Sequence, residues 1–398
     1  MGLGFVSYLA RRGSVTTDTE VCRALLPLHA LFVVQLAPLP EGLLRVLSPG
    51  SYAAHFLPYP GDGQYRSISV SPGVTVESWL YVVGLQGLLL AVRGLPPRDR
   101  RKAVHWLIAV ILGLAGEGLW QSRSDRPYWP LTLFYFELPA GLDSGVFGPY
   151  FNRNHFATIV AAGAGLAAGL AGALAVSHGG MSRLLRSPAA SGHFVVLGGA
   201  SVFLALTAAA SGSRSGLIAA VAAVGFSALR LFGKRALLAA VALAAAFVVL
   251  AGASSIERMM RMDFMASRIL PWLDMTTLIR FFPVAGSGIG TFGATYWPYQ
   301  QNVTYEYWQF AHNEYLQMVI ETGLAGLFVA WLVARRASRT LLAETSMKEG
   351  VLAALMAFLV QALLDFPFRV SANAAILTII VGLGLADARD DSPGSTSR

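Results

Sequence analysis

The chain has 398 residues, of which 55% are hydrophobic and only 13% are charged. Because soluble chains carry roughly 25% charged residues, this composition excludes a protein that covers its whole surface with polar groups in water. The formal net charge is +8, but the basic residues lie mostly in short loops between apolar runs, which indicates membrane topology and excludes nucleic acid as a partner. Cys22 is the only cysteine, so no intrachain disulfide forms.

The first residues, MGLGFVSYLARRGS, lack the apolar run and the small-residue cleavage site of a signal peptide. We therefore expect this segment to be retained. Further along, apolar stretches bounded by charge, Gly or Pro are long enough for helices of about 20 residues, the length that spans a hydrocarbon core. The predicted spans are 24–39, 78–94, 103–120, 155–177, 193–209, 215–231, 235–253, 313–334, 349–364 and 373–387. The predicted fold class is an all-α membrane protein, a polytopic helical bundle of about ten transmembrane helices.

The basic residues predict the orientation of these helices. With a cytoplasmic amino terminus, dense basic loops such as 98–102 and 335–339 lie inside, so both termini are cytoplasmic. Three long segments then lie outside, at 40–77, 121–154 and 254–312. The last of them has helical spacing of apolar residues, which predicts a large helical periplasmic loop.

The predicted organisation has four parts. Residues 1–253 hold membrane helices 1 to 7 with two outside loops, and residues 254–312 form the large periplasmic loop. Residues 313–387 hold helices 8 to 10. The polar tail 388–398 lacks aromatic residues and is predicted to be disordered in the cytoplasm.

Each polar cluster of interest falls on the predicted outside face. The first is GPYFNRNHFA at 148–157, where Arg153, Asn154 and His155 lie at the start of a helix. Asn caps helices, and a helix amino terminus is also a natural anion site, so capping and binding both remain open.

The second cluster is SGSRSG at 211–216, a short turn between two apolar helices with Arg214 at its centre. A turn requires Gly and Ser but has no need of Arg. The planar guanidinium can hold a phosphate through two hydrogen bonds. The alternative is an interfacial arginine that contacts lipid head groups.

The third cluster lies in the large loop. Arg268 and Trp272 are four residues apart and hence on one helix face, and Arg280 and the segment PVAGSGIGTF at 283–292 follow. The three glycines of this segment permit close backbone approach to a ligand. A nucleotide site is rejected, because neither a strand nor a P-loop lysine precedes them.

The fourth cluster is AHNEYLQMVIETGLAG at 311–326, with His312 at the outer mouth of a membrane helix. Glu321 lies roughly 13 Å deeper and faces away from His312 in a straight helix, whereas Glu314 and Glu321 share a face. An ionisable residue at this depth is either functional or bonded to a neighbouring helix, and both alternatives remain open.

Other carboxylates carry less weight. Asp365 and Arg369 flank the FPF turn between the last two spans, and a structural ion pair explains them. We find no Asp-x-Asp pair outside that would hold Mg²⁺, so we expect neither a metal nor another cofactor.

In order and spacing, FNRNHFA, SGSRSG, Arg268-x-x-x-Trp272 with PVAGSGIGTF, and HNEYLQMVIETGLAG resemble the O-antigen ligase and polymerase superfamily. The resemblance runs from about residue 148 to 372, and more weakly over the earlier segment LAPLPEGLLRVLSP. Members of that family often carry about a dozen spans, so this chain is shorter by a helix or two.

The resemblance implies an inverting, metal-independent glycosyltransferase of the membrane-embedded GT-C type in a bacterial inner membrane. Its donor would be an undecaprenyl-pyrophosphate-linked glycan, its acceptor a lipid A core or another glycan, and its site would face the periplasm or cell exterior. Carried over by residue, His312 would be the general base, and Arg214, Arg268 and Arg280 would bind the pyrophosphate. Possible substrate contacts are Arg153, Asn154, His155, Glu314 and Glu321.

The chemistry of these side chains agrees with the resemblance. Fixed guanidinium groups stabilise the charge that develops on a departing pyrophosphate, and an imidazole suits the removal of a proton from an acceptor hydroxyl. These residues do not distinguish a ligase from a capsular or exopolysaccharide polymerase. A transporter would place polar groups near the bilayer midplane, and a scaffold would tolerate alanine at Arg214, Arg268 and His312.

Overall fold

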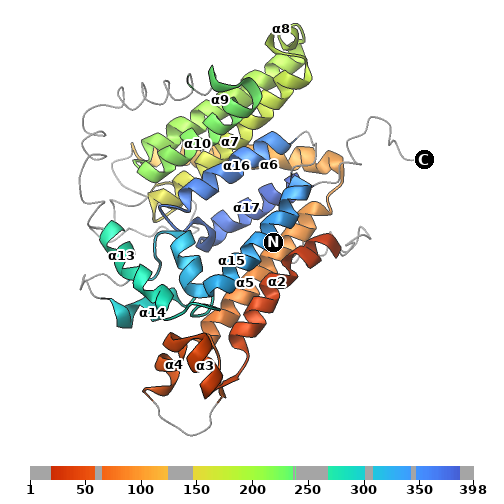
Figure 1. Ribbon diagram of the computed structural model, residues 1–398. Helices are drawn as coiled ribbons and strands as arrows, with labels where there is room; N and C mark the ends of the chain where they lie inside the picture. Colours follow the sequence, from red (N-terminus) through yellow and green to blue (C-terminus); the bar gives the residue numbers. More distant parts are fainter. Residues whose placement is uncertain are drawn as a thin grey trace, which may run out of the picture. The chain divides into compact units, whose positions relative to one another are not determined.

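The structure is a computed structural model that describes residues 19–58, 65–123, 147–235, 238, 268–300, 308–341 and 347–385 (Figure 1). Helices make up nearly all the regular structure of these residues. The only sheet among them is a short antiparallel pair, β1 (Leu39–Pro40) and β2 (Tyr65–Arg66). The expected all-α class is confirmed.

Seven helices of the described residues are long and apolar enough to cross a membrane. They are α2 (Thr19–Leu36), α5 (Pro72–Arg93), α6 (Pro97–Gln121), α7 (Arg153–Ser177), α9 (Pro188–Ala210), α10 (Arg214–Phe232) and α15 (Glu314–Leu341). They match the first six predicted spans and the eighth. The predicted span 235–253 lies outside the described residues apart from residues 235 and 238, and so do the tail 388–398 and parts of the large loop. The chain is a polytopic helical membrane protein.

The last two predicted spans are shorter than expected. Helices α16 (Lys348–Gln361) and α17 (Ser371–Gly384) have 14 residues each, about 21 Å of helix against a hydrocarbon core of about 30 Å. Between them lie the segment around Asp365 and the 3₁₀ turn η4 (Pro367–Arg369). Pro367 lacks the N–H that a continuing helix needs, which accounts for the break.

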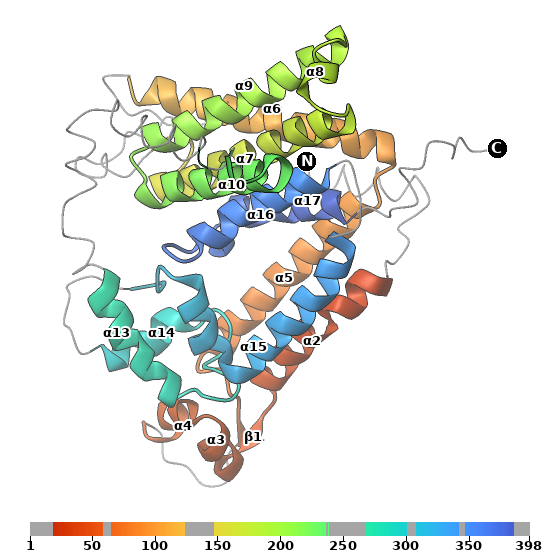
Figure 2. The same ribbon diagram turned by 45° about the horizontal axis from the view of Figure 1, so that its top comes forward.

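The chain folds as two compact units, and the second contains α6, α7, α8 (Met181–Leu184), α9, α10, α16 and α17. Helix α7 is its core and packs against α9, α10 and α16 (Figure 2). An added Cβ at Gly165 would meet the backbone of Ala353, and one at Gly169 would meet the backbone at Glu349. The small residues of α7 therefore serve close helix packing, for which their four-residue spacing is typical.

The first unit contains α2, α5, α15 and the short helices outside them. The short helices are α3 (Glu41–Leu47), α4 (Pro49–Phe56), α13 (Leu270–Thr276), η2 (Thr277–Arg280), α14 (Phe292–Tyr296) and η3 (Trp297–Tyr299). Helices α2 and α5 meet where Phe32 stacks on Trp79, whose indole N–H donates to His29 Nδ1 over 2.9 Å. Helical structure within the large loop is thus confirmed for its described part.

Helix α15 is broken at Gly323, which has φ 59° and ψ −156°. The segment 283–292 fills the break with its own backbone. The hydrogen bonds run from Ser287 N to Ile320 O (3.0 Å), Gly288 N to Glu321 O (3.1 Å), Leu324 N to Pro283 O (3.0 Å) and Ala325 N to Val284 O (2.9 Å). A broken helix is tolerated at membrane depth only where protein satisfies the freed groups, and this segment does so.

The glycines of this segment lie against the protein itself. Gly286, with φ 74°, faces the backbone carbonyl of Glu321. Gly288, with φ 107°, faces Ser69. The close approach expected of these glycines is therefore real, but the observed neighbours are α15 and the chain leading into α5, where a ligand was expected.

Gln35 of α2 ties the same elements together from inside. Its Nε2 donates to Ala285 O over 2.7 Å and to Glu321 O over 2.8 Å, and its Oε1 accepts from Ile289 N over 3.0 Å. The side chain is fully buried. Three backbone groups therefore depend on one amide that water does not reach.

We expect Gln35→Leu to lower the free energy of unfolding by about 2–4 kcal/mol, because it leaves buried donors and acceptors unpaired. Thermal unfolding of the purified protein in detergent measures this loss. The matched control is Gln309→Leu, since Gln309 is exposed and its loss is expected to be nearly neutral. Equal shifts for the two variants would contradict the assigned role of Gln35.

Candidate functional site

His312 has an unusual backbone. It is the only non-glycine residue of the described ranges with positive φ, at 51°. Such a conformation costs on the order of 1–3 kcal/mol in a residue with a side chain and persists only where its surroundings hold it. His312 lies two residues before α15, at the helix mouth where the sequence placed it.

The peptide before His312 is held on both sides by side chains. The Trp272 indole N–H donates to Ala311 O over 2.7 Å, and Ala311 N–H donates to Gln317 Oε1 over 2.9 Å. Ala311 is fully buried, so these two bonds fix the orientation of the chain as it enters His312. Trp272 thus has a defined partner, and Gln317 is a site residue that the sequence did not reveal.

The imidazole of His312 is oriented by a buried carboxylate. Its Nδ1 lies 3.0 Å from Asp365 Oδ1, and Asp365 is fully buried. Arg268 Nη2 lies 3.4 Å from the same Nδ1. One nitrogen does not both donate to a carboxylate and accept from a guanidinium, and the shorter distance and the negative charge assign the proton to the Asp365 bond. The lone pair is therefore on Nε2, and the Arg268 cation lies beside the ring.

Aromatic rings complete the surroundings of His312. The Trp308 and Phe366 rings meet it edge-on, with centroids at 5.6 and 4.8 Å. The Arg268 guanidinium lies over Trp308, 5.6 Å from its centroid, a cation–π geometry. The His312 side chain keeps 23% of its surface exposed, so it remains accessible from solvent. Arg268 and Trp272 contact His312 and Ala311, which are neighbours in the chain. These contacts agree with the expectation that both side chains lie on one helix face.

The two glutamates of α15 differ from His312 in their surroundings. Glu321 is buried, and its Oε1 accepts from Gln317 Nε2 over 2.9 Å and from Phe292 N over 3.2 Å. These bonds favour the structural alternative for Glu321. Glu314 is also buried, and its backbone N–H donates to Ala362 O over 2.9 Å.

Arg280 lies in a pocket of its own. Twelve residues of largely helical chain, roughly 18 Å, separate it from Arg268. The pocket has a volume of about 540 Å³. It is lined by Thr277, Arg280, Phe281, Pro298, Tyr299 and Gln300. The structure therefore brings Arg268 to His312 and places Arg280 at the far end of the same helical segment.

A buried pair holds this segment in place. The Tyr296 hydroxyl donates to Asp274 Oδ2 over 3.0 Å, which joins α14 to α13. Burial first, and then the bond and charge of Asp274, raise the pKa of the Tyr296 phenol far above its usual value. The phenol consequently stays a hydrogen-bond donor at physiological pH.

In the second unit, the amino termini of α7 and α10 meet. Ser213 caps α10 by accepting from Gly216 N over 3.1 Å, and its hydroxyl donates to Asn154 Oδ1 over 2.7 Å. Asn152 caps α7 by accepting from Asn154 N over 2.8 Å. Capping is therefore the work of Asn152, and the Asn154 side chain joins the two helices.

The two arginines of this region are each the first residue of their helix. Arg153 begins α7 and Arg214 begins α10. An added Cβ at Gly212 would lie 3.6 Å from Arg153 Nη1, so the Arg153 guanidinium lies against the 211–213 turn. Two helix dipoles and two cations thus concentrate positive charge where an anion binds well.

Two buried side-chain amides form hydrogen bonds with this region. Gln361 Nε2 donates to Ser215 Oγ over 3.0 Å, and Asn373 Nδ2 donates to the backbone oxygen of His155 over 3.0 Å. Both amides are buried. These two residues were not predictable from the sequence, because an amide in an apolar helix shows the same pattern whatever it contacts.

Residues 199–331, about a third of the chain, match the family model described as O-antigen ligase. The matched region is an O-antigen ligase-like domain. This domain confirms the resemblance to the O-antigen ligase and polymerase superfamily, in which the enzymes are glycan ligases or polymerases of the membrane. No curated protein matched in a second comparison.

The O-antigen ligase domain contains Arg214, Arg268, Arg280 and His312. Asp365 lies beyond it. The sequence interpretation explained Asp365 by an ion pair with Arg369, and the structure shows in addition a bond from Asp365 to His312. The sequence held a hint of this contact, since the predicted topology placed the FPF turn on the same side of the membrane as His312.

We expect Ser213→Ala to lower the free energy of unfolding by about 1–2 kcal/mol through loss of the cap, with a further loss from the bond to Asn154. The matched control is Ser187→Ala, because Ser187 caps α9 by accepting from Ala190 N and its side chain makes no second bond within the described part of the chain. Chemical unfolding in detergent compares the two. Identical losses would show that the contact between α7 and α10 contributes nothing.

Proposed function

We propose that this protein transfers a glycan from an undecaprenyl-pyrophosphate carrier to an acceptor hydroxyl at the periplasmic face of the inner membrane. The proposal rests on one observation above all, the group formed by His312, Asp365 and Arg268. This group combines an oriented base with a fixed cation, the two functions that such a transfer requires.

The base step follows from the assigned tautomer. As the acceptor oxygen attacks the anomeric carbon, its proton passes to Nε2 of His312. The imidazole becomes a cation, and the Asp365 carboxylate at Nδ1 stabilises that charge without taking the proton. The same bond holds the ring at a fixed angle.

The leaving group requires the cations. The bond between the anomeric carbon and the pyrophosphate oxygen breaks as the new bond forms on the opposite face, so the configuration inverts. Negative charge accumulates on the pyrophosphate, and guanidinium groups in a partly dry site stabilise it without a metal. We assign this role to Arg268 and Arg214, with Arg153 as a further cation beside the Arg214 turn.

The acceptor decides between a ligase and a polymerase. A ligase transfers a completed chain to a lipid A core or a similar acceptor, whereas a polymerase transfers it to a new lipid-linked repeat. The transfer chemistry at His312 is the same for both. We propose the ligase reaction as the function, and the acceptor assay below separates it from the polymerase reaction.

Glycan transfer in reconstituted vesicles tests the proposal directly. With an undecaprenyl-pyrophosphate oligosaccharide and candidate acceptors, we expect His312→Ala, Arg268→Ala and Arg214→Ala to lower transfer by at least about 100-fold. Asp365→Asn is expected to lose a comparable factor through misorientation of the ring. Arg186→Ala, on an exposed loop, is the charge-matched control.

The possible outcomes separate the rival functions. Undiminished transfer by the folded His312 and arginine variants would falsify the proposed site. No transfer by the unaltered protein with any acceptor would favour a transporter or a scaffold. Arg280→Ala is expected to lose less than Arg268→Ala, because its pocket lies away from His312.

Trp272→Phe tests the contact that holds His312. The variant keeps an aromatic ring but loses the N–H that donates to Ala311 O, so we expect kcat to fall roughly 10-fold with little change in KM for the donor. Trp297→Phe is the control, since Trp297 is exposed and lies in a neighbouring turn. A change confined to KM would contradict a positioning role for Trp272.

A further inference from the structure

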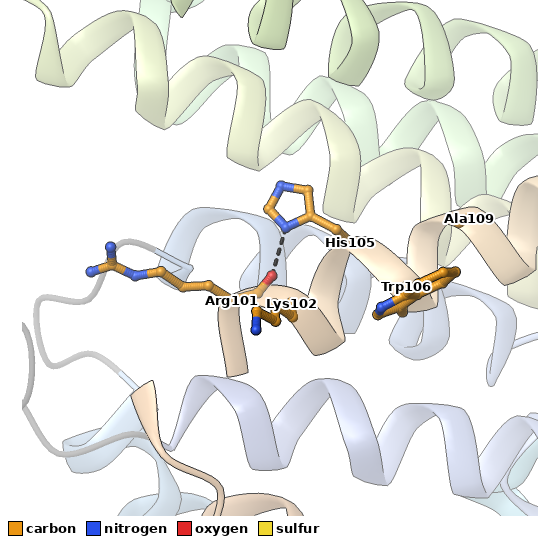
Figure 3. Close-up of a pocket in the computed structure, with 5 residues that line it drawn as sticks. All are labelled: Arg101, Lys102, His105, Trp106 and Ala109. Atoms are coloured by element: carbon orange, nitrogen blue, oxygen red, sulfur yellow. Dashed lines mark hydrogen bonds between the residues drawn. The ribbon is translucent and has the colours of Figure 1, made fainter. Parts of the chain in front are cut away.

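The exposed face of α6 carries a pocket that the transfer reaction does not use. The pocket has a volume of about 520 Å³ and is lined by Arg101, Lys102, His105, Trp106 and Ala109 (Figure 3). All five residues belong to one helix and all are exposed. The pocket is an open, shallow depression on the surface of the helix.

The order of these residues along α6 runs from charged to apolar. Arg101 and His105 are four residues apart, and so are Lys102 and Trp106, which places two adjacent rows of side chains on the face. Figure 3 shows the charged side chains near the start of the helix and Trp106 and Ala109 further along it. A ligand that follows the helix would meet cations first and an apolar surface next.

Two histidines fix the charged end of the pocket. His105 Nδ1 lies 2.6 Å from Arg101 O, and because a carbonyl only accepts, Nδ1 carries the proton. His105 Nε2 therefore accepts from His193 Nε2 over 2.9 Å, and this bond joins α6 to α9. Arg101 and Lys102 bring positive charge to this pocket.

The apolar end continues as a path of small residues. Beyond Ala109, Gly113 and Gly116 are exposed, and an added Cβ at either glycine would meet nothing within 4 Å. Trp106 and Trp120, 71% and 59% exposed, lie at the two ends of this path. The path is about 21 Å long, and exposed tryptophans at both ends of a membrane helix are typical of the two lipid interfaces.

We propose that this face of α6 binds one anionic phospholipid of the surrounding bilayer. Arg101 and Lys102 hold its phosphate, and one acyl chain lies along Ala109, Gly113 and Gly116. Cations at the end of an apolar helix lie at head-group level and attract anionic lipids. A soluble anion would make no use of the small-residue path, and an apolar helix would make no use of the cations. The inference does not depend on the proposed transfer reaction.

Native mass spectrometry of the full chain in detergent, titrated with phosphatidylglycerol or phosphatidylcholine, tests this site. We expect one phosphatidylglycerol to bind more tightly than phosphatidylcholine, and the double variant Arg101→Gln, Lys102→Gln to bind it roughly 10- to 30-fold more weakly. The double variant Arg183→Gln, Arg186→Gln removes the same charge from exposed positions in α8 and the turn after it, and is expected to bind as the unaltered protein does.

A second variant tests the acyl path without altering charge. Ala109→Trp fills the path at an exposed position, so we expect it to fold, as thermal unfolding verifies, and to weaken phosphatidylglycerol binding. Equal binding of the two lipids, unchanged binding by the Arg101 and Lys102 variant or by Ala109→Trp, or displacement by excess inorganic phosphate would each overturn the proposal. So would a lipid-free dimer that Ala109→Trp abolishes, because a second copy would then occupy the face.

Discussion

The break in α15 sets the constraint on which the first unit depends. A helix that stops at membrane depth exposes backbone groups that lipid does not satisfy, so protein must reach them. The segment 283–292 does so with its backbone, and Gln35 bonds both the segment and the helix. Because α13 leads into this segment and His312 leads into α15, the arrangement that closes the break also brings Trp272 to the peptide before His312.

Polar groups buried in this protein fall into two kinds. Gln35, Gln317 and Glu321 satisfy backbone or one another and hold elements in register. Asp365 instead bonds a side chain that remains partly open to solvent. A buried carboxylate beside a reachable imidazole orients a reactive nitrogen, whereas a buried amide on a backbone group stabilises the fold.

Arginine side chains lie at several distinct places in the structure. Arg268 lies beside His312, and Arg214 and Arg153 begin helices whose dipoles add to their charge. Arginine keeps its charge in a partly dry site, where lysine would lose its proton more readily. The cations at Arg101 and Lys102 occur at the end of an apolar helix face, and we assign them to lipid. In these assignments, the ligand of an arginine depends on whether the protein surface around it is apolar or polar.

The sequence by itself determined the fold class and most of the long helices, and it pointed to the segments in which we propose the chemistry to lie. Apolar length and the placement of basic loops are local properties, so α7 or α10 was predictable within a few residues. The pairing of Arg268 with Trp272 followed from helical spacing, and His312 from its place at a helix mouth.

Tertiary structure alone decided the partners. Asp365 is 53 residues from His312, and Gln35 is 286 residues from Glu321. The break at Gly323 also depends on segments distant in the chain. Because of this break, the glycines of the segment 283–292 pack against protein, where the sequence predicted a ligand. Periodicity reports which face of a helix is apolar, but hydrogen bonds between distant segments arise only when packing brings those segments together.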